Sequence, residues 1–431
     1  MEDLARRVAI VGAGYAGMAA AVTLAQRGVP VTVFEAGPVP GGRARRVLSQ
    51  GTDLDNGQHI LVGAYSALFG MMRTVGVPDS ALLRLPLEIR YPGKFHMRAR
   101  RLPMPLGLAL GMLAARGVPF SERTAALRFM SILGKEGFTL EEDISVDRLL
   151  ERHGQAGAIG HYLWRPLCVS ALNTPSAIAS ATLFLRTLRE TLAGGPGAAD
   201  LVLPRVDLSR LFPEPAAAFV KSKGGAIHLR SPVQDLHQLK QECAAVIVAV
   251  GPHQLKGLLP GLALGFTYQP IYTCYLQYPE TVKLPFPMLG LADGLVQWVF
   301  DRGALLGEHG RLACVISAQG DHQQMTLDEL AVRCHQELRQ VADLPDPAWT
   351  RVIAEKRATI TSAVAARKVP TEIDGVLLAG DYTDPDYPPT LEAAVRSGVR
   401  AALKVAQELD CLVEPLHGDD FQPVGLSPGK I

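Results

Sequence analysis

The chain has few of the residues that indicate metal, disulfide or nucleic-acid chemistry. Its six cysteines are scattered without a Cys-x-x-Cys pair, which predicts neither a zinc site nor a disulfide framework and is typical of a reducing compartment. Aromatic residues make up only 6% of the sequence, and 43 basic residues balance 42 acidic ones. Nucleic-acid binding needs a basic surface, often with stacking aromatic side chains, so we expect no nucleic-acid partner. The scattered cysteines likewise lead us to expect no metal ion.

No apolar run is long enough to cross a membrane, for which roughly eighteen uninterrupted apolar residues are needed. The nearest segment, residues 102–115, is interrupted by Pro103 and Pro105. It is framed by four arginines: Arg98, Arg100, Arg101 and Arg116. The segment is either a buried helix with its arginines at the solvated rim, or a peripheral contact with anionic headgroups at a membrane surface.

Length and composition predict a two-domain enzyme with an apolar substrate or a membrane contact. The 431 residues can bury a core large enough for two domains. Hydrophobic residues make up 48%, and the mean hydropathy of +0.15 is high for a soluble enzyme, which favours an apolar tunnel or a membrane contact. The first strand begins so near the N-terminus that we expect no signal peptide. We therefore expect a cytoplasmic protein, peripheral on the inner face of the membrane if residues 102–115 form the contact.

The N-terminal segment has the pattern of a nucleotide-binding βαβ unit. An apolar strand at residues 7–11 leads into a Gly-x-Gly-x-x-Gly turn, and a helix is predicted over residues 15–26. A second strand, at residues 31–34, ends on Glu35. Because strand, glycines, helix, second strand and terminal acid are all in register, the pattern predicts a dinucleotide site, with Glu35 accepting hydrogen bonds from ribose hydroxyls.

Each glycine of the turn has a separate expected role. Gly12 permits the tight turn, Gly14 lets the backbone approach a pyrophosphate, and Gly17 lets the helix pack closely on the strand. The pyrophosphate would lie at the helix N-terminus, which includes Ala16, because unpaired N–H groups and the positive end of the helix dipole favour an anion there.

A second glycine pair favours FAD over NAD as the dinucleotide. Gly41, Gly42 and Arg43 follow shortly after the ribose-binding acid. An NAD enzyme has no need of such a loop, whereas FAD lies extended, and a second loop must approach its pyrophosphate and isoalloxazine end. Arg43 would supply a charge-assisted contact to a phosphate.

The C-terminal part contains the second half of the same architecture. A short apolar strand ends in Gly380 and Asp381, and a helix is predicted from Thr390 to about residue 407, with Leu391 in its first turn. Asp381 would hold the ribityl chain, and the helix N-terminus would stabilise negative charge on a reduced flavin. No cysteine lies between Gly380 and Thr390, which predicts that FAD is bound non-covalently.

These motifs resemble those of the amine oxidase and phytoene desaturase superfamily of flavoproteins. Further strings at residues 55–65, 164–168 and 171–175 are similar to segments of the squalene-associated desaturase-like group, the hydroxysqualene dehydroxylases of bacterial hopanoid biosynthesis. The resemblance extends over nearly the whole chain. It implies that Val233 touches the adenine through its backbone.

The predicted fold class is α/β, with a Rossmann-like FAD-binding domain of the glutathione reductase type into which an α+β substrate domain is inserted. The FAD-binding domain would comprise residues 1–85, 211–261 and 346–412. The substrate domain would have a helical part at residues 86–210 and a sheet part at residues 262–345, and a tail would follow at residues 413–431. A long apolar ligand would reach the flavin through a tunnel between the domains.

Removal of an allylic hydroxyl, which the resemblance implies, needs an acid that faces the flavin from the substrate side. Asp55 and His59 are the candidates, because their segment runs beside the isoalloxazine in the resembled superfamily. His59 would donate a proton near neutral pH, and Asp55 would have a pKa raised by burial or would orient His59. Alternatively, Asp55 caps a turn and His59 is a satisfied buried histidine. The candidates for the pocket wall are Tyr65, Trp164, Asn173 and Tyr387.

Three functions fit the motifs, and all of them imply a long apolar isoprenoid ligand. The first is reductive dehydroxylation of hydroxysqualene to squalene, which also needs a reductant of unknown identity for the flavin. The second is dehydrogenation of a carotenoid-like polyene, the same fold used in the oxidative direction. The third is a flavoprotein that binds isoprenoids without catalysis, which the intact cofactor motifs at both ends disfavour.

Overall fold

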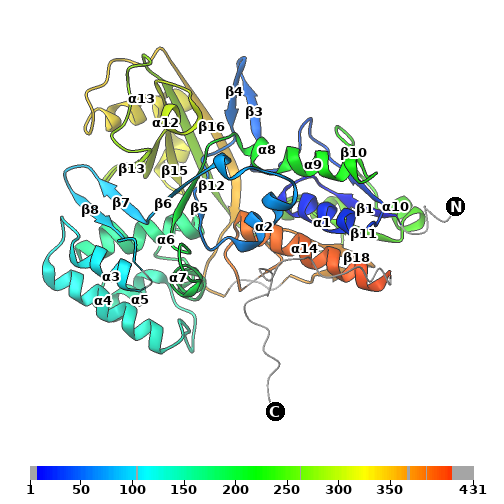
Figure 1. Cartoon of the computed structure of the whole chain (residues 1–431), viewed down its shortest axis with the longest axis horizontal. Helices are drawn as coiled ribbons and strands as arrows, with labels where there is room; N and C mark the ends of the chain where they lie inside the picture. Colours follow the sequence, from blue (N-terminus) through cyan, green and yellow to red (C-terminus); the bar gives the residue numbers. More distant parts are fainter. Residues whose placement is uncertain (1–6, 103–104, 263, 366–368, 385, 410–431) are drawn as a thin grey trace.

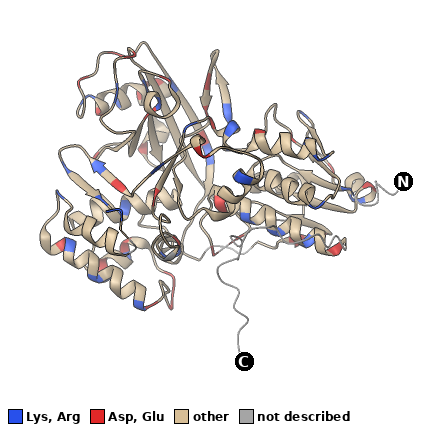
Figure 2. Ribbon diagram, in the orientation of Figure 1, with Lys and Arg blue, Asp and Glu red and all other residues tan. Residues whose placement is uncertain are grey.

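The computed structural model describes residues 7–102, 105–262, 264–365, 369–384 and 386–409. The predicted tail at residues 413–431 lies outside these ranges, as do Pro103 and Cys411. A parallel sheet with its helices forms the right side of the molecule in Figure 1, and an antiparallel sheet with a group of helices forms the left side. Acidic and basic positions both occur on each side of the molecule, in keeping with the balanced charge (Figure 2).

The parallel sheet has six strands in the order β10-β2-β1-β11-β18-β17. All of its pairings are parallel except that of β17 with β18. Its strands are β1 (Val8–Val11), β2 (Val31–Phe34), β10 (Ala226–His228), β11 (Ala245–Val248), β17 (Glu372–Ile373) and β18 (Val376–Leu378). The central strands are short apolar runs because helices cover both of their faces.

One face of this sheet is covered by α1 (Tyr15–Gln26), α9 (Pro213–Ser222) and α14 (Leu391–Glu408), which share one hydrophobic core with Ile10 and Ile247. Helices α1 and α14 approach closely, since a Cβ on Gly398 would overlap the carbonyl oxygen of Ala16. The opposite face packs against Leu236 and Leu255, next to α10 (His237–Glu242) and within α11 (Pro252–Leu258). The predicted Rossmann-like sheet is therefore confirmed.

The antiparallel sheet has five strands in the order β13-β14-β15-β12-β16. They are β12 (Tyr268–Gln277), β13 (Met288–Gly290), β14 (Trp298–Asp301), β15 (Arg311–Ser317) and β16 (Trp349–Ile360). Side chains of β12 alternate between two cores: Cys274 packs toward α13 (Leu327–Leu338), and Tyr275 packs toward the helical part. Strand β16 pairs along β12, so residues 349–360 belong to this sheet, although the sequence pattern placed residues 346–412 in the FAD-binding domain.

The helical part lies beside the antiparallel sheet and contains more strand than its pattern predicted. Its helices are α3 (Leu106–Leu113), α4 (Phe120–Lys135), α5 (Val146–Arg152), α6 (Arg165–Leu172), α7 (Ala181–Ala193) and the short α8 (Leu208–Leu211). The hairpin of β7 (Glu88–Tyr91) and β8 (Phe95–Arg98) precedes them. No helix among the described residues is long and apolar enough to cross a membrane.

Short pairings connect this part to the N-terminal segment. Strand β9 (Leu201–Pro204) pairs with β5 (Leu61–Val62) and β6 (Leu82–Leu85). The hairpin of β3 (Arg46–Ser49) and β4 (Thr52–Asp55) precedes β5 in the sequence. Helix α2 (Ser66–Thr74) follows β5. Residues 55–65 thus run between the two halves of the molecule.

Candidate active site

Two glycine loops meet at the N-terminus of α1. The Gly41 N–H donates to the carbonyl oxygen of Ala13 at 2.8 Å, and a Cβ on Gly42 would lie 3.2 Å from the Cα of Gly14. A Cβ on Gly17 would overlap the carbonyl oxygen of Gly12, which accounts for a glycine at the position predicted to bring helix and strand together. No side chain caps the N-terminus of α1, so its N–H groups remain available to an anion.

Glu35, at the end of β2, already organises the first glycine loop. One carboxylate oxygen accepts from the Ala13 N–H at 2.8 Å, and the other accepts from the Gly37 N–H at 2.7 Å. Each oxygen has a second lone pair, so the carboxylate can also accept from ribose hydroxyls. Val233, which was predicted to touch the adenine, borders the same cavity.

The GGR loop and the C-terminal Gly–Asp turn are joined by an ion pair. Arg43 Nη2 lies 2.6 Å from Asp381 Oδ1, and Arg43 Nη1 donates to the carbonyl oxygen of Ala358 at 2.7 Å. From the sequence, Arg43 was predicted to bind a phosphate and Asp381 to bind the ribityl chain. In the structure these two side chains form an ion pair with each other. Thr390 caps α14 by accepting from the Ala393 N–H.

All of these elements border one cavity of about 1170 Å³. It includes eleven of the twelve residues predicted to bind the cofactor: Gly12, Gly14, Ala16, Glu35, Gly42, Arg43, Val233, Gly380, Asp381, Thr390 and Leu391. The twelfth, Gly17, packs behind the turn. The cavity exceeds the range of roughly 300–1,000 Å³ usual for ligand pockets, which leaves room for a dinucleotide and a second ligand.

The end of the cavity away from the glycine loops is mainly apolar. Its apolar residues are Val169 and Ala171 of α6, Ile271 of β12, Trp298 and Phe300 of β14, and Val315 of β15, and Ser170 and Ser317 lie among them. These residues were not predicted to line the cavity. Alternating apolar residues predict a strand, but they do not show which face of the strand borders a ligand. Tyr65 and Asn173 line the cavity as predicted. The Asn173 amide is held, accepting from the Ala318 N–H at 2.8 Å and donating to Thr359 Oγ1 at 3.1 Å.

Two predicted wall residues lie elsewhere. Trp164 is buried in the core of the helical part, where its indole N–H donates to Gln155 Oε1 at 3.0 Å. Tyr387 is buried beneath the guanidinium of Arg396, which lies 4.6 Å from the ring centre. Neither side chain borders the cavity. Both predictions are wrong, because an aromatic residue in a family-like string or before the last helix is equally suited to filling a core.

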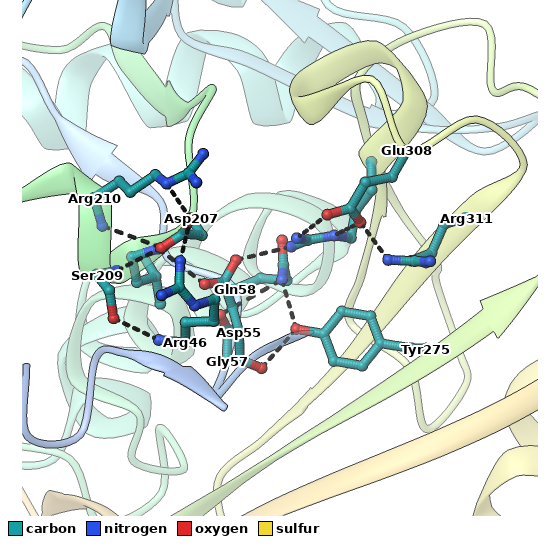
Figure 3. A network of polar contacts seen from close by, with 12 residues as sticks. Arg46, Asp55, Gly57, Gln58, Asp207, Ser209, Arg210, Tyr275, Glu308 and Arg311 are labelled. Atoms are coloured by element: carbon teal, nitrogen blue, oxygen red, sulfur yellow. Dashed lines mark hydrogen bonds and ion pairs between the residues drawn. The ribbon is translucent and has the colours of Figure 1, made fainter. Parts of the chain in front are cut away.

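Asp55 is also absent from the large cavity. Its two carboxylate oxygens accept from the Leu208 N–H at 2.8 Å and from Arg302 Nη1 at 3.0 Å, and both side chains of this ion pair are buried. Burial raises the pKa of Asp55, and the positive charge of Arg302 opposes that rise. Figure 3 shows the carboxylate within a network that extends to Glu308 and Arg311. These contacts are those of a structural side chain, and the catalytic role of Asp55 stays a prediction.

The segment after Asp55 is held by a second set of contacts. The Tyr275 hydroxyl donates to the carbonyl oxygen of Asp55 at 2.7 Å and accepts from Gln58 Nε2 at 2.9 Å (Figure 3). On the cavity side, Asn56 Nδ2 donates to Glu355 at 3.1 Å. These partners are far away in the sequence, and no local pattern indicated them.

His59 is the titratable candidate that reaches the cavity. Its imidazole forms no hydrogen bond or ion pair with any residue that the structure describes, which does not fit a satisfied core histidine. Removal of water around the ring and the positive charge of Arg43 lower the pKa of His59 to about 4. At neutral pH the ring is therefore neutral, in contrast to the easy proton donor that the sequence suggested. His59 and Asp55 also border a separate cavity of about 10 Å³, which is at the lower limit for holding one water molecule.

A parallel sheet with two glycine loops on a long cavity, closed by an antiparallel sheet, defines a flavin-dependent oxidoreductase of two-domain architecture. The chain belongs to the family of flavin-containing amine oxidoreductases, whose pattern matches residues 15–406. FAD is the cofactor of this family, and the glycine cradle, Glu35 and the uncapped N-terminus of α1 fit it.

The similarity to known proteins extends over almost the full length of this chain. A hydroxysqualene dehydroxylase of Zymomonas mobilis is 27% identical, with 91% of this chain and 97% of the relative covered. One of Rhodopseudomonas palustris is 28% identical, with 93% and 98% covered. Among solved structures, cyclohexylamine oxidase from Brevibacterium oxydans has a TM-score of 0.64 at 17% identity, covering 94% of this chain and 99% of its own. The latter likeness concerns the fold alone.

Proposed function

We propose that the protein uses reduced FAD to remove the allylic hydroxyl group of a hydroxysqualene, with squalene as the product. The observation that carries the proposal is the likeness to hydroxysqualene dehydroxylases over more than nine-tenths of both chains. The apolar wall of the cavity supports it, because a long hydrocarbon is stabilised by about 25 cal/mol for each Å² of apolar surface removed from water.

The reaction breaks a C–O bond, forms a C–H bond and releases water. Reduced FAD, when bound, supplies the hydride for the new C–H bond. The protein has to hold the allylic carbon in place, keep water from the cationic carbon and deliver a proton to the departing oxygen. Trp298 and Phe300 would exclude water, and a ring nitrogen of His59 would hold the proton.

The first test is a single turnover without oxygen. When the holoenzyme is reduced with dithionite and mixed with 12-hydroxysqualene, we expect the flavin to reoxidise and one squalene to appear per flavin oxidised. Absorbance follows the flavin, and chromatography of the extract identifies the product. Squalene in place of the alcohol serves as the control and should leave the flavin reduced. Flavin that stays reduced with the alcohol would contradict the proposal and favour oxidation of a polyene instead.

The role of His59 predicts a pH dependence. The protonated imidazole is the acid, and it predominates only below the His59 pKa of about 4. Its population therefore falls tenfold for each pH unit above that value, and the reoxidation rate should fall with it. We expect His59→Gln to lower the rate by about 10²–10⁴-fold and to remove this slope. Single-turnover rates between about pH 5 and pH 8 measure both effects.

Asp55→Asn is the matched control, because it alters the other candidate acid, which lies outside the large cavity. It should retain the pH slope of the unaltered protein. A slope that persists in His59→Gln, or disappears in Asp55→Asn, would reverse the assignment of the acid.

A further inference from the structure

Helix α3 exposes leucines that a helix of this composition would ordinarily bury. The helix is eight residues long and entirely apolar apart from two glycines. Yet Leu106 and Leu110 are 53% and 40% exposed, and Leu102, just before the helix, is 45% exposed. We call these three residues the leucine patch.

The glycines explain why the leucines face outward. A Cβ on Gly107 would overlap the carbonyl oxygen of Arg100, and a Cβ on Gly111 would overlap that of Arg98. The glycine face of α3 therefore lies directly on the backbone that precedes it, and Arg100 N–H donates to the Gly107 carbonyl at 2.9 Å. Leu106 and Leu110 are four residues apart and share another face of the helix. Phe120, 63% exposed, begins the next helix.

The stretch of sequence that contains the patch is basic. Residues 89–121 contain no Asp or Glu, although the whole chain carries 42 of them. The cations of this stretch are Arg90, Lys94, Arg98, Arg100, Arg101 and Arg116. Arg100 and Arg116 are exposed and form no ion pair with any residue that the structure describes.

We propose that the leucine patch and its arginines dock on an anionic lipid bilayer. Leucines inserted at the level of the headgroups lose contact with water, and the arginines bind the phosphate groups around them. Of the two interpretations of residues 102–115, a buried helix is inconsistent with the exposure of α3. A second copy of this chain fits less well, because two copies facing each other would bring their arginines together.

The test is flotation of the FAD-loaded full-length protein with lipid vesicles. We expect binding to vesicles of phosphatidylcholine mixed with phosphatidylglycerol, much weaker binding to phosphatidylcholine alone, and loss of binding as salt is added. Substrate is absent from this assay, whereas the turnover test above uses substrate without vesicles. A failure of vesicle binding is therefore distinct from a failure of the proposed function.

Two pairs of substitutions separate the apolar and the charged contributions. Leu106→Ser with Leu110→Ser should weaken binding about tenfold at all salt concentrations. Arg100→Gln with Arg116→Gln should weaken it about thirtyfold at low salt, because each arginine near an anionic surface contributes about 1 kcal/mol.

Matched controls come from exposed residues elsewhere. Leu229→Ser with Leu327→Ser, at leucines that are 39% and 48% exposed, and Lys221→Gln with Arg339→Gln should bind vesicles like the unaltered protein. Equal binding to both vesicle types, or patch variants that bind normally, would overturn the proposal. So would a dimer in gel filtration that Leu106→Ser with Leu110→Ser dissociates, since the patch would then be an interface between copies.

Discussion

Gly14→Val should yield a folded protein that has lost FAD. Gly14 has φ −72° and ψ −179°, an extended conformation that valine adopts readily. The protein atom nearest to a Cβ built there is the Cα of Gly42, at 3.9 Å. The apoprotein therefore has space for the side chain, but that space is the part of the cavity where the two glycine loops meet.

We expect the affinity for FAD to fall by at least about a hundredfold, or roughly 3 kcal/mol, because the valine would occupy the position of the pyrophosphate. Flavin absorbance of the purified protein, titration with added FAD and thermal unfolding of the apoprotein measure the outcome. Gly134→Ala in α4 is the control: nothing lies within 4 Å of its Cβ, and it should retain FAD. A Gly14→Val protein that is yellow and binds FAD normally would mean that the cradle is not the pyrophosphate site.

Arg302→Met should destabilise the protein by about 3–5 kcal/mol, the range for breaking a buried ion pair by removing one partner. The Arg302 side chain is 1% exposed. Its guanidinium binds Asp55 at 3.0 Å and both oxygens of Glu308 at 2.6 and 2.9 Å. The substitution leaves the Asp55 carboxylate buried without a counter-charge. Urea unfolding monitored by circular dichroism measures the loss.

The loss should depend on pH in a direction that identifies Asp55. Burial already raises the pKa of Asp55 in the folded protein, and removing Arg302 takes away the charge that opposes this rise. A carboxyl group whose pKa is higher when folded favours the folded state at low pH and loses that contribution as pH rises through the folded pKa. The penalty of Arg302→Met should therefore be smaller near pH 5 than near pH 8.

Two further variants define the cause. Adding Asp55→Asn to Arg302→Met should restore part of the stability, because the buried charge is removed. Arg311→Met, which removes the other cation on Glu308 at a more exposed position, should cost only about 1 kcal/mol. A penalty for Arg302→Met that does not change with pH would show that lost packing, and not the Asp55 charge, is responsible.

The residues that build the cofactor site could be found from the sequence because each motif is local. In the N-terminal unit, strand, turn and helix follow one another directly, and helix α1 has the predicted bounds. A backbone that must curve tightly and remain open to an anion needs glycine at fixed spacing, so the spacing itself carries the information. Eleven of the twelve predicted cofactor residues consequently border one cavity.

The substrate side was harder to predict because its residues meet only through distant pairings. Strand β16 was placed in the wrong part, since nothing in residues 349–360 shows that they pair with β12. Asp55 was taken for an acid, although its partner Arg302 is 247 residues away and could not be identified in advance. Trp164 and Tyr387 were placed on the cavity wall because one lies in a family-like string and the other just before the last helix, and neither position shows whether a side chain fills the core.

The sequence by itself determined the class of this protein: a Rossmann-like FAD domain with an inserted substrate domain, and a family whose pattern extends over residues 15–406. Only the tertiary structure decided which of the two candidate acids reaches the cavity, and that α3 turns its leucines outward. The physical reason is that a phosphate-binding turn is a property of consecutive backbone atoms. The ionisation of a side chain and the face that it presents depend on which distant residues exclude water around it.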